Sequence, residues 1–181
     1  MRSATVIDRL SELWGRLLAA LALLGCLMLL AMMMIIVADV ALRNLALPGL
    51  PRGLGWSNEI SEWLLLLVTL CVAPWLLRQG QHIRVDIVLQ PLPPRLAWGL
   101  EWLGDLLGLV TCFVLMVVSG KAMLSSMAAG ALSIKTLVIP EWWTLAPMPL
   151  AFGLLSVEML FRMHRLWRAD RAPRRDAVSA A

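Results

Sequence analysis

Four long apolar runs dominate the chain, and shorter stretches between them carry most of the charges. The first run is uncharged over residues 17–38, which is long enough to cross about 30 Å of hydrocarbon as an α-helix. The later runs reach a similar length only when a few acidic residues are included. We therefore expect transmembrane spans at residues 17–38, 60–77, 96–120 and 142–161. The pattern predicts an all-α integral membrane protein, with one four-helix domain over residues 1–165 and a basic tail over residues 166–181.

The ends of the apolar runs carry further signals. The nine tryptophans lie at or near these ends, as expected for rings that prefer the headgroup level of a bilayer. Before the first run, apolar residues from Val6 to Leu17 fall on one helical face and predict an amphipathic lead-in helix. Pro74 and the shorter length of the later runs leave short or partly interfacial helices open as an alternative.

Basic residues are distributed unevenly among the predicted connections. With four spans, the two odd-numbered connections hold four basic residues, and the termini and the middle connection hold the other twelve of the 16. The four are Arg43, Arg52, Lys121 and Lys135. Because arginine and lysine are enriched in cytoplasmic segments of membrane proteins, we expect both termini to be cytoplasmic.

Composition supports the membrane class and narrows the function. Hydrophobic residues make up 60% of the chain and charged residues 15%, whereas about a quarter of the residues in soluble domains are charged. The formal charge of +4 does not indicate nucleic-acid binding, since the arginines flank apolar runs. The three cysteines fall in different runs without metal-ligand spacing, and His82 and His164 are too few for a haem or metal site. We expect no cofactor and no enzymatic activity.

The middle connection contains the sequence RQGQHIRVD, which raises the question of a site. In it, His82, Arg84 and Asp86 alternate with apolar residues, so an extended segment would place the three polar side chains on one side. As a helix, the same segment would pair His82 with Asp86 instead. The segment is either a solvated loop that sets topology or a contact with a partner protein, and it lacks the accompanying groups that catalysis needs.

Several other polar and small residues are candidates. We expect Asp39 to pair with Arg43, and Glu158 with Arg162, since both spacings are i,i+4. Two further carboxylates, Glu101 and Asp105, share a helix face and would repel each other if both were charged, which leaves proton coupling or pairing with a basic group open. Gly104 and Gly108 form a GxxxG motif, which allows close approach of a second helix.

Three stretches of the chain resemble a known family. They are DVALRN at the end of the first run, WSNEISEW at the start of the second, and APWLLRQGQHIRVDIVLQPLP after it. Together they are similar to the small, Q-type membrane subunit of tripartite ATP-independent periplasmic (TRAP) transporters. The resemblance covers the chain from the first predicted span to the fourth.

The resemblance implies a four-helix subunit in the bacterial inner membrane. Its partners would be membrane lipids, a large multi-span permease subunit and a periplasmic substrate-binding protein, in sodium-coupled uptake of an organic acid such as a carboxylate. The residues at the family's characteristic positions are Asp39, Arg43, Glu59, His82, Val85 and Asp86, which the resemblance assigns to folding, headgroup anchoring or the subunit interface. An alternative is a free-standing four-helix exporter that acts as a dimer and uses Glu101 or Asp105 as its proton site.

Overall fold

The structure, a computed structural model of the 181-residue chain, describes residues 6–45, 53–80 and 93–168. Its elements are α1 (Val6–Leu45), α2 (Ser57–Arg78), α4 (Pro94–Ala129), β1 (Leu132–Ile134), β2 (Val138–Pro140), α5 (Glu141–Leu145) and α6 (Pro147–Arg168). Four helical segments are long and apolar enough to cross a membrane: Arg9–Leu45, Ser57–Arg78, Leu96–Ala129 and Glu141–Trp167. The predicted all-α class with four such segments is confirmed.

The first helix is much longer than the first predicted span. The expected lead-in helix and the span form one continuous helix of 40 residues, about 60 Å long at 1.5 Å per residue. No proline interrupts this stretch, so nothing breaks its backbone hydrogen bonds. Because the hydrocarbon core is only about 30 Å thick, α1 either tilts strongly or extends into the headgroup region.

Proline and glycine set the limits of α4. Pro94 occupies the first turn of the helix, where its missing N–H would have no helical partner in any case. At the other end Gly130 has a φ of +60°, a left-handed conformation that costs glycine little. The N–H groups of Gly130 and Ala131 bind the carbonyls of Met127 and Ser126. This arrangement ends α4 and turns the chain into β1.

A small β-hairpin, which the hydrophobic pattern does not predict, connects α4 to the last span. β1 and β2 pair antiparallel, with Leu132 opposite Pro140 and Ile134 opposite Val138. The last span itself consists of the short α5 and the longer α6, which are separated by Ala146. Pro147 and Pro149 lie in the first turn of α6, where their missing N–H groups cost no helical hydrogen bond.

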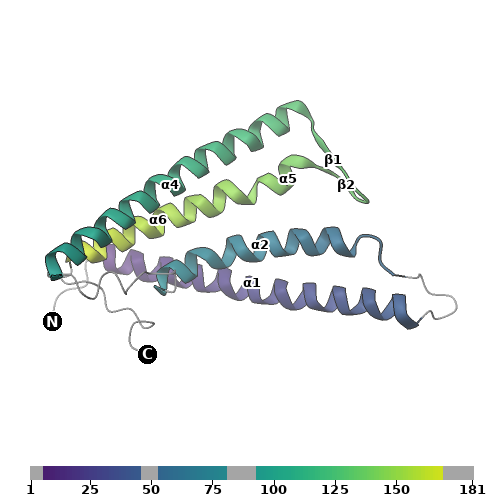
Figure 1. The fold of residues 1–181 in the computed structure, drawn as a ribbon, viewed down its shortest axis with the longest axis horizontal. Helices are drawn as coiled ribbons and strands as arrows, with labels where there is room; N and C mark the ends of the chain where they lie inside the picture. Colours follow the sequence, from purple (N-terminus) through teal and green to yellow (C-terminus); the bar gives the residue numbers. More distant parts are fainter. Residues whose placement is uncertain (1–5, 46–52, 81–92, 169–181) are drawn as a thin grey trace.

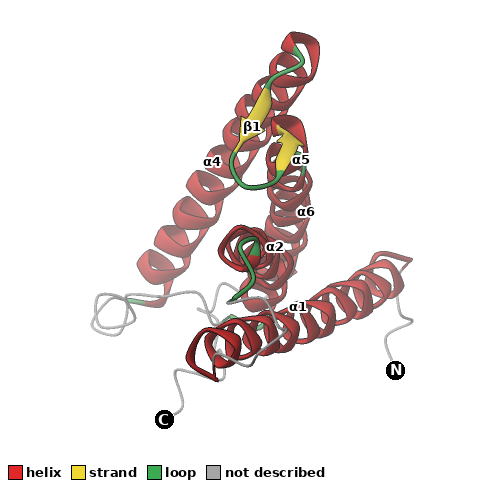
Figure 2. Ribbon diagram, turned by 90° about the vertical axis from the view of Figure 1, so that its right-hand side faces the viewer, coloured by secondary structure: helices red, strands yellow, loops and turns green. Residues whose placement is uncertain are grey.

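The helices form two pairs that diverge from one end of the molecule. α1 packs mainly against α2 and α4 mainly against α6, while α2 and α6 join the two pairs. Figure 1 shows that the pairs converge near the start of α1 and the end of α6 and separate toward the β-hairpin. Figure 2, turned by 90°, shows α2 between α1 and the α4–α6 pair. We call the two ends of the molecule the terminal end and the hairpin end.

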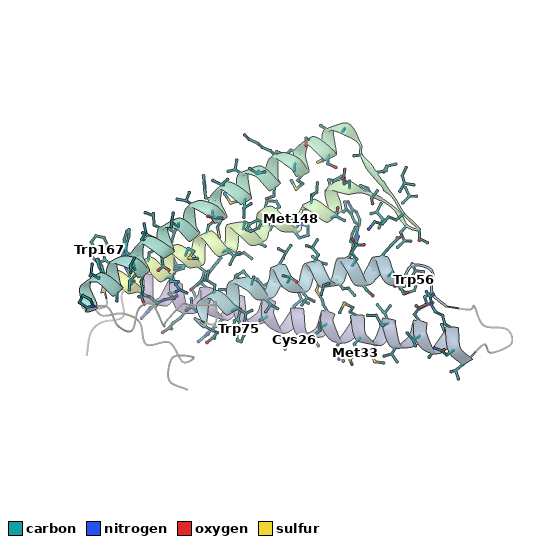
Figure 3. All side chains as sticks on the ribbon, in the orientation of Figure 1. Cys26, Met33, Trp56, Trp75, Met148 and Trp167 are labelled. Atoms are coloured by element: carbon teal, nitrogen blue, oxygen red, sulfur yellow. The ribbon has the colours of Figure 1, made fainter. Side chains whose placement is uncertain are left out.

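Most of the large apolar side chains lie on the outside of this arrangement. Only 6% of the most apolar stretch of α1 is buried, and Met33, with 52% of its surface exposed, points away from the other helices in Figure 3. Such a surface fits a hydrocarbon solvent, in which apolar side chains need no protein cover. The figure also shows Trp56 and Trp167 at opposite ends of the molecule, at the levels where tryptophan anchors a span in the headgroup region.

Candidate functional site

A cluster of charged side chains joins the four helices at the terminal end. We call it the ion-pair cluster. Its hydrogen-bonded members are Ser11, Arg78, Asp105, Glu158, Arg162 and Arg165, and we include Glu101, which is buried one helical turn before Asp105. Three of these side chains are basic arginines and three are acidic, so their formal charges balance. Burying charges is expensive unless they are paired and hydrogen-bonded. The cluster therefore has the composition that a buried polar centre of a membrane protein requires.

Glu158 is the most deeply buried member, with no exposed surface. Its Oε2 accepts a hydrogen bond from Arg78 Nη1 at 3.2 Å and its Oε1 accepts one from Arg165 Nη2 at 2.5 Å. Arg78 in turn donates from Nη2 to the backbone carbonyl of Ser11 at 2.7 Å and to its hydroxyl at 3.3 Å. Through these bonds one carboxylate on α6 connects α2 and α1.

Arg162 connects the remaining helix. Its Nε donates to Asp105 Oδ1 at 3.0 Å, and its Nη1 donates to the backbone carbonyl of Leu77 at 3.4 Å. Both side chains of the pair are nearly buried, with 11% of the arginine and 6% of the aspartate exposed. Glu101 lies one turn before Asp105 and is buried as well. The second pair therefore joins α6 to α4 and to the end of α2.

A glycine makes room for the cluster on α1. A Cβ atom on Gly15 would lie 2.8 Å from three atoms of the Arg78 guanidinium, which is closer than packed heavy atoms approach. The absence of a side chain at this position thus lets Arg78 reach the carbonyl of Ser11, one turn earlier on α1.

The pairing within the cluster differs from the sequence-based expectation. The i,i+4 spacing favours a bond between Glu158 and Arg162, but the structure brings Arg78 and Arg165 to Glu158 and Asp105 to Arg162. The sequence analysis placed Arg78 in the connecting loop and did not consider Ser11. Asp105 faces a guanidinium, so of the two alternatives for this carboxylate the structure contains pairing with a basic group.

At the hairpin end, Asp39 organises the link between α1 and α2. Its Oδ2 accepts a hydrogen bond from Arg43 Nε at 2.9 Å, so the predicted ion pair is present. Its Oδ1 accepts a second bond, at 2.6 Å, from the backbone N–H of Leu54. Gly53, the residue before Leu54, has a φ of +108°, and a Cβ atom there would lie 3.1 Å from the Asp39 carboxylate. Asp39 thus fixes the residues that lead into α2.

A second polar contact at the hairpin end closes the gap between the helix pairs. We call it the clasp: Glu59 and Glu62 of α2, with Lys135, Thr136 and Leu137 of the β-hairpin turn. Glu59 accepts hydrogen bonds from the backbone N–H groups of Thr136 at 2.5 Å and Leu137 at 2.8 Å. Lys135 donates to Glu62 at 2.7 Å, and this hydrogen bond to a carboxylate raises the pKa of Lys135 above its ordinary value.

From the clasp we predict that Glu59 protects two backbone amides of the hairpin turn from hydrogen exchange with water. In Glu59→Gln the side chain loses the charge that strengthens both bonds, so hydrogen exchange at the amides of Thr136 and Leu137 should accelerate about ten-fold, as expected for loss of a charge-assisted bond. Mass spectrometry of the hairpin peptide measures this rate. Glu62→Gln is the matched control, because Glu62 bonds to a side chain and should leave these two amides unchanged. Equal exchange in the two variants would contradict the clasp.

The other candidate residues have different surroundings. His82, Arg84 and Asp86 lie outside the described residues. A Cβ on Gly108 would come within 2.7 Å of the end of the Met159 side chain, whereas a Cβ on Gly104 would meet no atom within 4 Å. Gly108 therefore lies in the contact between α4 and α6, and Gly104 faces away from the other helices that the structure describes. Among the described residues no group of three potential ligands could hold a metal ion.

Comparison with protein families agrees with this architecture. Residues 32–169 match the family described as "Tripartite ATP-independent periplasmic transporters, DctQ component". The match begins within α1 and includes α2, α4, the β-hairpin, α5 and α6. The chain belongs to this family. It is therefore a small membrane component of a TRAP transporter, and a multi-pass protein of the inner membrane. A search of the curated proteins finds no match.

Most residues of the two polar contact groups lie in the part of the chain that matches the family. All members of the clasp and all members of the ion-pair cluster except Ser11 lie within the matched residues. The membership also favours the accessory-subunit interpretation over a free-standing proton-coupled exporter. The polar groups of the ion-pair cluster and the clasp hold different elements together. The hydrogen bond between Arg165 and Glu158 lies within α6, and the others described for these two groups each link two elements.

Proposed function

We propose that this subunit is a scaffold for the large permease of a TRAP transporter. In this proposal the complete transporter takes up an organic acid, typically a carboxylate, that a periplasmic binding protein delivers, and a sodium gradient drives the uptake. The family match over residues 32–169 carries the proposal. The small subunit contributes a membrane-embedded surface and no substrate site of its own.

The exposed apolar helices support the scaffold role. Only 6% of the most apolar stretch is buried in α1 and 6% in the corresponding stretch of α4. These two helices lie on the outside of the two pairs (Figure 1), so each offers a long face to its surroundings. The ion-pair cluster and the clasp hold these faces in a defined relation to each other. A rigid pair of faces is what a scaffold for a larger membrane protein needs.

We also propose an orientation and a set of further contacts. With both termini in the cytoplasm, twelve basic residues lie inside and four outside, in agreement with the positive-inside rule. His82, Arg84 and Asp86 would then lie on the cytoplasmic side, where we assign them to the contact with the permease. Asp39, Arg43 and Glu59 would lie on the periplasmic side. Their hydrogen bonds support a folding role for them.

Reconstitution of the transporter tests the proposed function directly. Vesicles that contain this subunit and its large permease, supplied with the binding protein, should accumulate a radiolabelled carboxylate only when sodium is higher outside. Vesicles without the small subunit should lose the uptake, while the binding protein should retain its affinity for the carboxylate. Uptake that persists without this subunit, or without sodium, would contradict the proposal.

Gly104 provides a sharper test of the scaffold surface. Among the described residues, no atom of another element lies within 4 Å of a Cβ atom added at Gly104. Gly104→Leu should therefore leave the isolated subunit folded but obstruct a closely packed partner helix. We expect the yield of permease that co-purifies with the subunit to fall several-fold. Gly99→Leu is the matched control, since Gly99 is also open but lies on another face of α4. Equal co-purification of the two variants would exclude Gly104 from the interface.

A further inference from the structure

The two helix pairs enclose an apolar groove at the hairpin end. One cavity of about 460 Å³ lies between α1 and α2 on one side and α5 and α6 on the other, and Leu21, Cys71 and Leu154 contribute to its lining. A second cavity of about 250 Å³ lies nearer the clasp, beside Glu59 and Leu137. Leu67 and Trp143 line both cavities. The two cavities are therefore parts of one groove.

The groove is bounded at both ends by the polar contacts of the subunit. The outer end of the groove is the one nearer the β-hairpin. There Glu59 lines the groove and accepts a hydrogen bond from the hairpin turn. At its inner end Leu154 lies one helical turn before Glu158, at the ion-pair cluster. Along α2 the lining extends from Glu59 to Cys71, a distance of about 18 Å at 1.5 Å per residue.

This length distinguishes between the occupants that an apolar groove can take. A partner helix that crosses the membrane needs about 30 Å of contact length, and the groove closes well before that. An acyl chain occupies one leaflet, which is half of the hydrocarbon core, or about 15 Å. The groove thus has the length of one acyl chain, and its larger cavity, of about 460 Å³, lies within the volume range of small-ligand pockets.

The charges at the outer end indicate the kind of headgroup. Lys135 lies two residues before Leu137 and Glu62 one residue before Trp63, and Leu137 and Trp63 both line the outer cavity. The side chains of Lys135 and Glu62 are 46% and 66% exposed. An exposed amine and an exposed carboxylate side by side complement the phosphate and the ammonium of a zwitterionic phospholipid. Glu59 is occupied by two backbone N–H groups. Lys135 donates one N–H to Glu62, and an ammonium group has two further N–H donors that can bind a phosphate.

We propose that the groove binds one acyl chain of a zwitterionic phospholipid, whose headgroup lies at Lys135 and Glu62. The bound chain fills the space between the two helix pairs where their own side chains do not meet. This site does not depend on the proposed transport function, because it uses only contacts within the subunit and with the bilayer.

Photo-crosslinking tests the site. The full chain, alone or co-expressed with its large permease, is placed in vesicles of phosphatidylethanolamine that carries a diazirine at the end of one acyl chain. After irradiation, we expect more lipid adducts at Cys71 and Leu154 than at Leu27, which is 56% exposed on α1. Adducts at the groove that are no more frequent than at Leu27 would overturn the proposal. So would groove adducts that disappear when the permease is present, because the permease would then be the occupant.

A pair of variants sharpens the result. Leu67→Trp fills the point where the two cavities meet, and it should reduce the adducts at Cys71 and Leu154 about ten-fold, as expected for an overpacked site. Leu65→Trp is the matched control, because Leu65 lies on the same helix with 54% of its surface exposed and does not line the groove. Unchanged adducts in Leu67→Trp would overturn the proposal, and the comparison within the wild-type chain stands even if this variant folds poorly.

Discussion

Replacing Glu158 by glutamine is expected to destabilise the folded subunit by about 3 kcal/mol, the lower end of the range for breaking a buried ion pair. The change keeps the shape of the side chain but removes the charge that Arg78 and Arg165 share. Arg78 is the more affected of the two, because only 20% of its side chain is exposed. Arg165 is 41% exposed and can turn toward water or lipid headgroups. The expected loss of stability is therefore at the lower end of the range for a buried ion pair.

Unfolding of the purified subunit in mixed micelles, followed by tryptophan fluorescence as the fraction of denaturing detergent rises, measures this loss. Glu12→Gln is the matched control. Glu12 is exposed on α1 near the same end of the molecule, so its replacement should change the stability by less than about 0.5 kcal/mol. If the two variants unfold at the same detergent fraction, the ion-pair cluster does not stabilise the fold.

Arg162 and Asp105 are expected to be strongly coupled. Arg162→Met and Asp105→Asn should each be destabilising, because each removes one charge of a buried ion pair. The double variant should be more stable than the sum of the two single effects predicts, by about 1–3 kcal/mol, the coupling typical of residues in one buried network. The same unfolding assay, applied to the four proteins of the cycle, gives this coupling energy.

The exposed pair Lys135 and Glu62 is the comparison for this cycle. Its nitrogen and oxygen atoms are closer than those of the buried pair, at 2.7 Å against 3.0 Å, but water and salt screen it. A much smaller coupling is therefore expected for Lys135→Met and Glu62→Gln. Additive effects at Arg162 and Asp105 would show that the two side chains act independently, despite the bond at 3.0 Å.

The position of the spans could be predicted from local sequence, although their ends could not. Residues 17–38 are uncharged and identify the first span, but α1 begins at Val6 and continues to Leu45. The helix extends because nothing in the flanking residues breaks it, and a polar flank outside the hydrocarbon still forms helix. The β-hairpin was missed because strands of three residues are too short for a period of two to be visible.

Among the polar contacts, one within a single helix could be predicted from the sequence, whereas those between distant elements could not. The bond between Asp39 and Arg43 was predictable, because a spacing of four residues brings side chains together on any helix. Glu59 was singled out by resemblance, but nothing in the sequence indicated that its partners are two backbone N–H groups of the hairpin turn. Arg78 was assigned to the connection after the second predicted span, which ended at residue 77. Its bond to Glu158 was not predictable from local spacing, because the two residues lie 80 positions apart in the chain.

By itself the sequence determined that the chain has four membrane-spanning helical segments and belongs to a transporter family. Both follow from local properties: the preference of each residue for hydrocarbon or water, and the order of residues in short motifs. Only the tertiary structure decided which arginine neutralises which carboxylate, how the hairpin closes onto Glu59, and where an apolar groove remains between the helix pairs. These features depend on how helices far apart in the chain are oriented and spaced, and hydrophobicity fixes only which residues enter the membrane, not which faces meet.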